Sequence, residues 1–326
     1  MNNSKTVLVT GANGHLGRRL VRLLSVRGYK VYANYRTEPK IAQFCPPEAT
    51  PVIGDITTPD WMPAAFKNIE CIIHTAAMVS LRPGWDKEMY QVNVNGTKNV
   101  VTAAKAAGVK RLIHISSIAA VGGAPDGQAL TESAPFNLDR TGLPYFQTKY
   151  EAEQIALSAA DKSFQVIVLN PSIIIFPPEK EINIEDLKKY RRWIPFYFDF
   201  GLNLVYADDV VEAAVNAIEM GRSGERYILS GENINPRVVF NLARKYLEIK
   251  RPIIKIPVAL LYPIFSAYEL FYGIFSHNGK GPRLNRGLAR LARLRFHYSS
   301  EKAVQELNFK SRSLDQTIDA ILSFRK

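Results

Sequence analysis

Apolar stretches of strand length alternate with amphipathic stretches of helical length through the first half of the chain. The apolar stretches lie at Thr6–Thr10, Lys30–Tyr35, 71–75, 111–116 and 165–170. Helical patterns lie between them, at residues 16–25, 85–107 and 145–160. Because these strands are apolar on both faces, they are typical of a parallel sheet that helices cover on both sides. We therefore predict an α/β fold, a doubly wound parallel sheet of the Rossmann type.

The second half of the chain is less regular. Residues 182–200 mix charged and aromatic side chains and are interpreted as an insertion, and a helical pattern follows at 210–220. From residue 221 onward the pattern is typical of a second lobe. We predict a cofactor-binding domain of residues 1–170 plus about 203–221, and a smaller C-terminal substrate lobe of about 171–202 plus 222–326.

The first strand runs directly into a glycine-rich loop, Gly11-Ala-Asn-Gly14-His-Leu-Gly17, which opens a helical pattern. Glycine permits the tight turn and lets the backbone approach a pyrophosphate, while the N-terminus of the helix offers free N–H groups. Taken alone, this loop indicates nucleotide binding and no particular reaction.

A second motif adds chemistry to nucleotide binding. Tyr145 and Lys149 are four residues apart and therefore share one face of the predicted helix. A tyrosine titrates near pH ~10, and an ammonium group one turn away lowers that pKa because it stabilises the phenolate. Ser116 and Ser117 end the preceding strand, where a hydroxyl group can hydrogen-bond a substrate oxygen; a turn or cap is the alternative role. Together with the loop, these residues predict the transfer of a hydride.

The chain resembles the extended branch of the short-chain dehydrogenase/reductase superfamily, the NAD-dependent epimerase/dehydratase family, over nearly its whole length. Within that branch it is most similar to the dihydroflavonol 4-reductase and 3β-hydroxysteroid dehydrogenase-like group. The motifs that carry the resemblance are Gly11-Ala-Asn-Gly14-His-Leu-Gly17, Gly54-Asp55-Ile56, His74-Thr-Ala-Ala77, Asn93-Val-Asn-Gly-Thr97, Ser116-Ser117, Tyr145-x-x-x-Lys149, Asn170-Pro171-Ser172 and Tyr206-Ala-Asp-Asp-Val210.

The resemblance implies a role for each motif. Tyr145 would be the catalytic acid/base, Lys149 its partner and a ribose ligand, and Ser117 the hydroxyl group that polarises the substrate, with Ser116 as the alternative. Asn93 would lie near the lysine or simply pack. The other cofactor-binding residues that it implies are Gly11, Asn13, Gly14, His15, Leu16 and Gly17 at the pyrophosphate, Asp55 and Ile56 at the adenine, Thr75, Ala76 and Ala77 at the adenosine ribose, and Asn170, Pro171 and Ser172 at the nicotinamide.

The end of the second strand bears on the choice of cofactor. An NAD site places an acidic residue there to bind the ribose hydroxyls, whereas this strand ends in Tyr35-Arg36. A guanidinium group would form a charge-assisted pair with the 2′-phosphate of NADP. We therefore predict that the cofactor is NADP. The alternative is NAD, with Arg36 as an exposed side chain that does not contact the cofactor.

Departures from the family pattern narrow the reaction. Sugar-nucleotide dehydratases of this branch carry an Asp-Glu pair after the hydroxyl residue, where this chain has Ile118-Ala119. We expect an NADP-dependent oxidoreductase that transfers a hydride between the nicotinamide and a secondary alcohol or ketone of an apolar or amphipathic small molecule. A nucleotide-sugar epimerase with tightly bound NAD is the alternative, and an NADP-binding sensor without turnover is a third hypothesis.

A net charge of +12 indicates either a solvated basic surface or an anionic partner, and no nucleic-acid motif accompanies it. Residues 253–275 are strongly apolar and aromatic but interrupted by prolines, a glutamate and a glycine, so a transmembrane helix is not expected. Arg283, Arg286, Arg290 and Arg293 follow at helical spacing. The segment either lines a pocket or makes peripheral membrane contact through residues 256–295.

The remaining expectations concern location and assembly. The two cysteines, Cys45 and Cys71, form neither a disulfide framework nor a zinc spacing, and the histidines show no metal pattern. We therefore predict a cytoplasmic protein without a metal site and without a signal peptide. The resemblance also implies a homodimer built from the helices at 85–107 and 145–160.

Overall fold

A seven-stranded, fully parallel sheet forms the centre of the molecule. The computed structural model describes residues 5–84, 86–177, 196–198, 200–246, 248, 254–275 and 281–322. The spatial order of the strands is β10-β6-β5-β4-β1-β2-β3. Their bounds are β1 Thr6–Thr10, β2 Lys30–Tyr35, β3 Thr50–Ile53, β4 Cys71–His74, β5 Arg111–Ile115, β6 Gln165–Pro171 and β10 Glu225–Leu229. Every pair of neighbours is parallel, which confirms the predicted doubly wound sheet.

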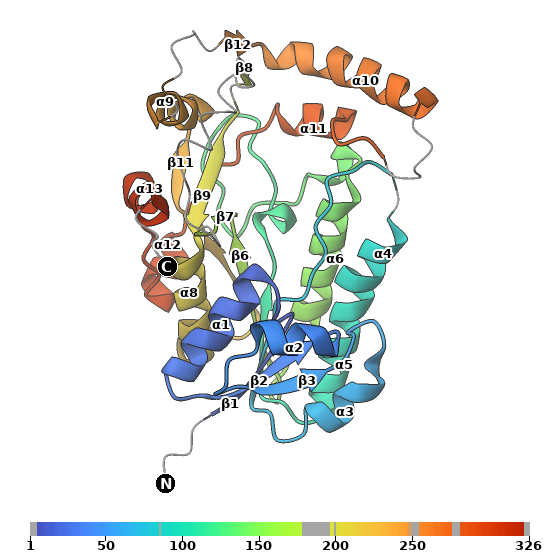
Figure 1. The fold of residues 1–326 in the computed structure, drawn as a ribbon, viewed down its shortest axis with the longest axis vertical. Helices are drawn as coiled ribbons and strands as arrows, with labels where there is room; N and C mark the ends of the chain where they lie inside the picture. The colour runs from blue at the N-terminus through green and yellow to red at the C-terminus, as the bar shows by residue number, and fades with distance from the viewer. Residues whose placement is uncertain are drawn as a thin grey trace.

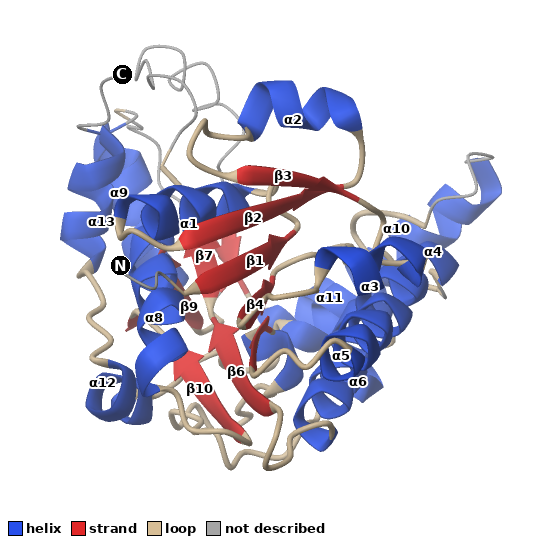
Figure 2. Ribbon diagram, turned by 90° about the horizontal axis from the view of Figure 1, so that it is seen from below, coloured by secondary structure: helices blue, strands red, loops and turns tan. Residues whose placement is uncertain are grey.

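Helices cover both faces of this sheet, as Figure 2 shows. On one face lie α1 (His15–Val26) and α8 (Ala207–Met220), which pack on each other and on Val7 and Val9 of β1. On the other face lie α3 (Met62–Ala65), α5 (Gly96–Ala106) and α6 (Pro144–Ser158), against Leu8 of the same strand. Alternate residues of a strand point to opposite faces, so both sets are apolar.

The helix expected over residues 85–107 is interrupted by a wider turn. It consists of α4 (Lys87–Tyr90), a π-helical turn (Gln91–Asn95) and α5, and Trp85 lies outside the described residues. A π turn inserts one extra residue per turn, and such turns are frequent at functional sites. Here it carries Asn93, one of the predicted site residues.

A second lobe lies beyond the carboxyl ends of the strands, with α10 (Leu261–Phe275) across its outer end above α11 (Arg286–Leu291), as Figure 1 shows. The small sheets have the orders β11-β9-β7 and β12-β8. The remaining elements are α2 Glu38–Phe44, β7 Ile173–Ile175, β8 Phe196–Phe198, β9 Leu202–Tyr206, β11 Glu232–Ile234, α9 Pro236–Tyr246, β12 Ile254–Ile256, α12 Glu301–Leu307 and α13 Leu314–Leu322.

The predicted division of the chain needs two corrections. Residues 222–326 were assigned to the second lobe, but β10 is the edge strand of the large sheet, in parallel register with β6. Likewise, β9 pairs with β7 and β11 rather than with the large sheet. Both results depend on pairing between distant segments, which a local pattern does not reveal. The predicted insertion at 182–200 falls largely outside the described residues.

Candidate active site

The predicted cofactor residues lie together at one edge of the large sheet. Apart from Asn93, Tyr145 and Lys149, which lie on helices, they follow or end β1, β2, β3, β4 and β6, because the carboxyl ends of parallel strands share one edge. From β1 the chain winds outward through β2 and β3, and from β4 it winds the other way. Ligands of open α/β sheets bind at such a switch point, here between β1 and β4.

The glycine-rich loop is packed so closely that its first and last glycines leave no room for a side chain. Gly11 has φ +68°, and a Cβ atom there would lie 2.9 Å from the backbone of Ala76. A Cβ atom on Gly17 would lie 2.2 Å from the carbonyl oxygen of Gly11. Gly14 caps α1 without a side-chain hydrogen bond, so the first N–H groups of the helix stay open to an anion. The loop therefore fits a pyrophosphate.

A buried hydrogen-bond chain holds the loop that follows β4. Thr97 donates its hydroxyl proton to the Asn93 carbonyl oxygen at 2.6 Å, so it accepts from Nε2 of His74 at 3.1 Å. Nδ1 of His74 then accepts from the Thr10 hydroxyl at 2.7 Å. Burial lowers the pKa of His74 to about 3, which keeps the ring neutral. His74 is thus a structural residue, and the described residues contain no group of acidic, histidine or cysteine side chains that could hold a metal.

Asn93 belongs to the same support. Its amide accepts from the backbone N–H of Met78 at 2.7 Å and donates to the Met78 carbonyl at 2.9 Å and to the Thr148 hydroxyl at 3.1 Å. The side chain is 2% exposed, and every one of these bonds joins protein groups. Asn93 therefore positions the loop after β4 relative to α6, and it does not line the cavity described below.

Tyr145, Lys149 and Ser117 face one another at the ends of α6 and β5. Nζ of Lys149 donates to the carbonyl oxygen of Ile115 at 3.0 Å, and burial lowers the pKa of this ammonium group to about 8. Burial raises the pKa of Tyr145, and a hydrogen bond with Ser117 acts in the opposite direction. Oγ of Ser117 accepts from the Ala119 N–H at 3.1 Å, so its own proton is directed to Tyr145 and can pass to a substrate oxygen beside it.

The two serines, which the sequence left as alternatives, have different partners. Ser116 is buried, and its hydroxyl donates to Oε2 of Glu153 at 2.5 Å. Nδ2 of Asn170 donates to the same carboxylate oxygen at 2.6 Å and to the Ser117 carbonyl at 3.0 Å. Because the hydroxyl proton of Ser116 is already used, the geometry favours Ser117 as the donor to a substrate.

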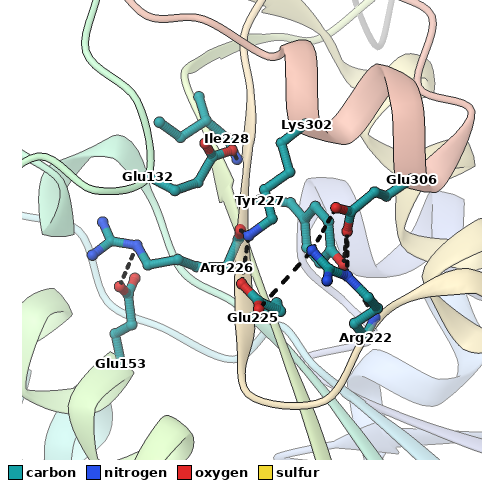
Figure 3. A network of polar contacts seen from close by, with 9 residues as sticks. All are labelled: Glu132, Glu153, Arg222, Glu225, Arg226, Tyr227, Ile228, Lys302 and Glu306. Atoms are coloured by element: carbon teal, nitrogen blue, oxygen red, sulfur yellow. Dashed lines mark hydrogen bonds and ion pairs between the residues drawn. The ribbon is translucent and has the colours of Figure 1, made fainter.

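Glu153 was not singled out from the sequence, although it lies four residues after Lys149 on the same helix. The side chain is fully buried, and its carboxylate faces Nε of Arg226 on β10 at 3.2 Å, as Figure 3 shows. Burial raises the pKa of Glu153, and the charge of Arg226 is the largest opposing effect. The carboxylate also raises the pKa of Lys149. The buried carboxylate of Glu153 thus connects three elements: α6, the end of β5 where Ser116 lies, and the edge strand β10.

A cavity of about 880 Å³ extends from the glycine-rich loop into the second lobe. The predicted site residues that line it are Gly14, His15, Leu16, Gly17, Thr75, Ala77, Ser117 with its alternative Ser116, Tyr145, Lys149, Pro171 and Ser172. The predicted site residues outside this lining are Gly11, Asn13, Arg36, Asp55, Ile56, Ala76, Asn93 and Asn170. The structure therefore brings the proposed catalytic groups and the loop to one shared space.

The far wall of this cavity is apolar. Among its lining residues from the second lobe are Phe198, Leu261, Phe265, Leu291 and Phe296. Of all the described residues that line the cavity, Lys149 is the only lysine, arginine, aspartate or glutamate. Residues 253–275, which include Leu261 and Phe265, were expected either to line a pocket or to contact a membrane. Phe198, Leu291 and Phe296 were not expected in the lining, because they come from segments about a hundred residues apart.

The residues expected at the adenosine end lie beside the loop. Arg36 follows β2 directly and is exposed. Asp55 follows β3, and its Oδ1 accepts from the backbone N–H and the hydroxyl of Thr57, both at 2.8 Å, which shapes the turn there. Ile56 is buried, and a Cβ atom on Gly96 would lie 2.6 Å from its Cδ1 atom. Their contact with adenine stays a prediction.

Two unpaired groups at the end of β6 suit a nicotinamide cofactor. Oδ1 of Asn170 and Oγ of Ser172 are buried and have no hydrogen-bond partner among the described residues. Buried polar atoms are rarely left unpaired, and a carboxamide offers both a donor and an acceptor. Ser172 lines the cavity whereas Asn170 does not, so the Ser172 hydroxyl and the open helix N-terminus are the groups that fit a dinucleotide.

Comparison with known proteins identifies the family. A model of the NAD dependent epimerase/dehydratase family matches residues 7–194. The chain belongs to this family. A Synechocystis sp. protein with the provisional name dihydroflavonol 4-reductase is 33% identical over 97% of this chain and 94% of its own length. Sterol demethylase protein B of Methylococcus capsulatus is 31% identical over 98% of both chains.

Solved structures agree with this assignment. A crystal structure of gox2253 is 32% identical with a TM-score of 0.79, over 98% of this chain and 96% of that chain. A dTDP-glucose 4,6-dehydratase from Streptomyces venezuelae, solved with NAD, shares the fold at a TM-score of 0.72 and 19% identity, over 97% and 95%. The resemblance to the extended short-chain dehydrogenases/reductases is confirmed, and the protein is an NAD(P)-dependent oxidoreductase of that group.

Proposed function

We propose that this enzyme uses NADP to interconvert a secondary alcohol and a ketone on an apolar or amphipathic small molecule. One observation carries the proposal: Ser117, Tyr145 and Lys149 lie in a cavity whose far wall is built from aliphatic and aromatic side chains. When bound, the cofactor supplies or accepts the hydride. Apolar walls with a few placed polar groups are typical of sites for apolar ligands.

Each polar group has a defined task in this proposal. Ser117 donates a hydrogen bond to the substrate oxygen, since its acceptor side is used by the Ala119 N–H. Tyr145 gives its proton to that oxygen during reduction and takes it back during oxidation. Lys149, held by the Ile115 carbonyl oxygen, favours the phenolate that Tyr145 becomes. The apolar wall excludes water, which strengthens these electrostatic effects.

The composition of the cavity favours this function over nucleotide-sugar chemistry. A sugar nucleotide carries a pyrophosphate, which proteins bind with arginine and lysine side chains. Among the described lining residues, Lys149 is the only such side chain, and it already serves Tyr145. Ile118 and Ala119, where dehydratases have an acidic pair, are both buried among apolar side chains. Net NADPH consumption by a ketone supports the proposal, whereas epimerisation with retained NAD supports the alternative.

Replacing Tyr145 tests the chemistry. We expect Tyr145→Phe to lower kcat by about 100-fold or more, because a positioned acid contributes at least that factor, while the Kd for NADPH stays unchanged. Tyr150→Phe is the matched control, since Tyr150 lies on the same helix, stacks on Phe136 at 4.3 Å and does not line the cavity. Full turnover by Tyr145→Phe would refute the proposed mechanism.

The preference for NADP rests on Arg36. A charged hydrogen bond is worth about 1.5–3 kcal/mol, so Arg36→Ala should weaken NADPH binding roughly 10- to 100-fold and leave NADH binding unchanged. Arg237→Ala removes another exposed arginine, on α9 in the second lobe, and is the control. Equal loss for both cofactors, or a wild-type preference for NADH, would overturn the assignment.

We also propose a cytoplasmic homodimer. Both cysteines are free, and burial raises the pKa of Cys71 to about 12, which keeps that thiol unreactive. The packed pair of α5 and α6 offers a helical surface to a second copy. Sedimentation velocity tests the assembly: a concentration-dependent dimer is expected, and a monomer at every concentration contradicts it.

A further inference from the structure

We propose that α10 docks the enzyme on an anionic membrane surface and opens its substrate cavity toward lipid. The outer face of α10 would lie among the headgroups, while its inner face forms part of the cavity wall. The substrates would then be amphipathic alcohols or ketones that reside in the bilayer. The docking is argued from α10 and its surroundings alone. Only the class of substrate rests on the function proposed above.

The outer face of α10 is apolar and uncovered. Of the 17 large apolar side chains that are exposed among the described residues, seven lie within residues 260–275. Leu270, Phe271, Ile274 and Phe275 are each between 61% and 70% exposed. The rings of Phe271 and Phe275 lie 4.4 Å apart and form one continuous surface. Clustered exposure of this kind marks an interaction site rather than ordinary surface.

The inner face of the same helix is anchored and functional. Leu261 and Phe265 are buried, pack with Ala289 of α11 and line the cavity. Glu269 accepts from Nε of Arg286 at 3.0 Å and from its backbone N–H at 3.1 Å, which fixes the middle of the helix. The helix thus has one face in the substrate site and the opposite face in solvent, and Figure 1 shows it at the outer end of the molecule.

Positive charge borders this apolar face. Arg283, Arg286, Arg290 and Arg293 are all exposed, although α11 covers only Arg286–Leu291, so they do not form the single helical stripe that their spacing predicts. The guanidinium groups of Arg290 and Arg293 lie 5.9 and 6.0 Å from the centre of the Tyr262 ring on α10. Apolar side chains beside arginines match an anionic lipid surface, which attracts each basic residue.

Part of the cavity rim lies beside α11. Among the described residues, three exposed large apolar side chains line the cavity and mark its rim: Val79, Leu81 and, on β7, Ile173. The carbonyl oxygen of Leu81 accepts from Nδ2 of Asn285, the cap of α11, at 3.0 Å. A molecule that leaves the bilayer next to α10 therefore meets an apolar rim and an apolar wall.

The geometry favours a helix that lies in the membrane plane. The segment Val258–Phe275 is apolar enough to span, with a mean hydropathy of 1.5 and 11% of it buried, and it is the only such segment among the described residues. However, α10 itself has 15 residues and measures about 22 Å, shorter than the ~30 Å hydrocarbon core. Its inner face is also fixed to α11 by Glu269.

Vesicle sedimentation with the full chain tests the docking. We expect binding to vesicles of phosphatidylcholine and phosphatidylglycerol, weaker binding to phosphatidylcholine alone, and release by salt. The double variant Leu270→Ser, Phe271→Ser should lower the partition coefficient about 100-fold, since each side chain contributes roughly tenfold. Val26→Ser, which removes an exposed side chain from α1, is the matched control and should bind as the wild type does.

Three outcomes would overturn the docking: no binding of the wild type to anionic vesicles, equal binding by the double variant, or resistance to alkaline extraction, which indicates a spanning helix. If the wild type does not bind vesicles but forms a dimer that the double variant converts to a monomer, the outer face of α10 is an interface with a second copy of this chain. Turnover of a short water-soluble ketone separates this test from the proposed function. The double variant should keep that turnover, because neither residue lines the cavity. A wild-type protein that binds vesicles but turns over no ketone would refute only the function.

Discussion

Removing the buried carboxylate of Glu153 should destabilise the protein more than removing any acid of the neighbouring surface network. The side chain has no exposed area, accepts hydrogen bonds from Ser116 at 2.5 Å and Asn170 at 2.6 Å, and faces Arg226 at 3.2 Å. Glu153→Ala leaves all three donors in the interior without their acceptor. Arg226 is 17% exposed, so solvent compensates its charge only weakly.

The magnitude follows from these contacts. Breaking one partner of a buried ion pair costs about 3–5 kcal/mol, because an uncompensated charge remains. The entropy of unfolding of a 326-residue chain is roughly 0.7 kcal/mol/K at about 2.1 cal/mol/K per residue. The Tm should therefore fall by about 4–7 °C. Arg226→Ala should lower the free energy of unfolding less in the Glu153→Ala background than in the wild type, since the two side chains are coupled.

Urea unfolding and differential scanning calorimetry measure both quantities. The matched control is Glu225→Ala, from the same network in Figure 3, because Glu225 is 39% exposed where it pairs with Lys302 at 2.6 Å. An exposed pair is worth about 0–1 kcal/mol. If Glu153→Ala costs no more than this control, or if the double variant is additive, the buried network does not hold the catalytic helix as argued here.

Three further predictions concern the site. Lys149 loses its proton above its lowered pKa of about 8, so kcat/KM for ketone reduction should fall above that pH. Glu153→Gln should move this fall in kcat/KM to lower pH, because the carboxylate raises the Lys149 pKa. A pH profile that is the same in the variant and the wild type would contradict this role of Glu153. Gly17→Ala should abolish cofactor binding in a fluorescence titration, since its Cβ would lie 2.2 Å from a carbonyl oxygen of the loop, whereas Gly273→Ala, with open space around it, should bind normally. Phe265→Ala should raise KM for bulky apolar ketones more than for short ones in steady-state assays, because the side chain lines the far wall; an equal effect on both refutes the assignment of that wall.

Local pattern was sufficient to predict five of the seven strands of the large sheet and the position of the loop. The apolar strands and the glycine spacing are properties of short segments, and each strand predicted in the first half lies within one or two residues of its observed bounds. Gly28 and Gly108, which follow helical patterns, adopt the left-handed conformation expected of helix caps. The strand β3 (Thr50–Ile53) was not predicted. It has only four residues, and three of them are exposed, so no buried apolar stretch marks it in the sequence.

Contacts between distant segments could not be predicted in the same way. Ser116 and Ser117 are adjacent in sequence, and only the position of Glu153 and Asn170 around them separates their roles. The edge position of β10 depends on its register with β6. The cavity wall combines residues of β8, α10 and α11. The periodicity of each segment does not indicate that it lies near Tyr145.

The proposed reaction at this site is the reduction of an apolar ketone, or the oxidation of the corresponding alcohol, with NADP. Its most direct test follows the near-ultraviolet absorbance of NADPH while the purified full chain meets a graded series of amphipathic ketones, with a nucleotide sugar alongside. We expect net NADPH consumption that rises with the apolar area of the ketone and falls about 100-fold in Tyr145→Phe. No consumption with any ketone, together with epimerisation of the nucleotide sugar by protein that retains NAD, would contradict it.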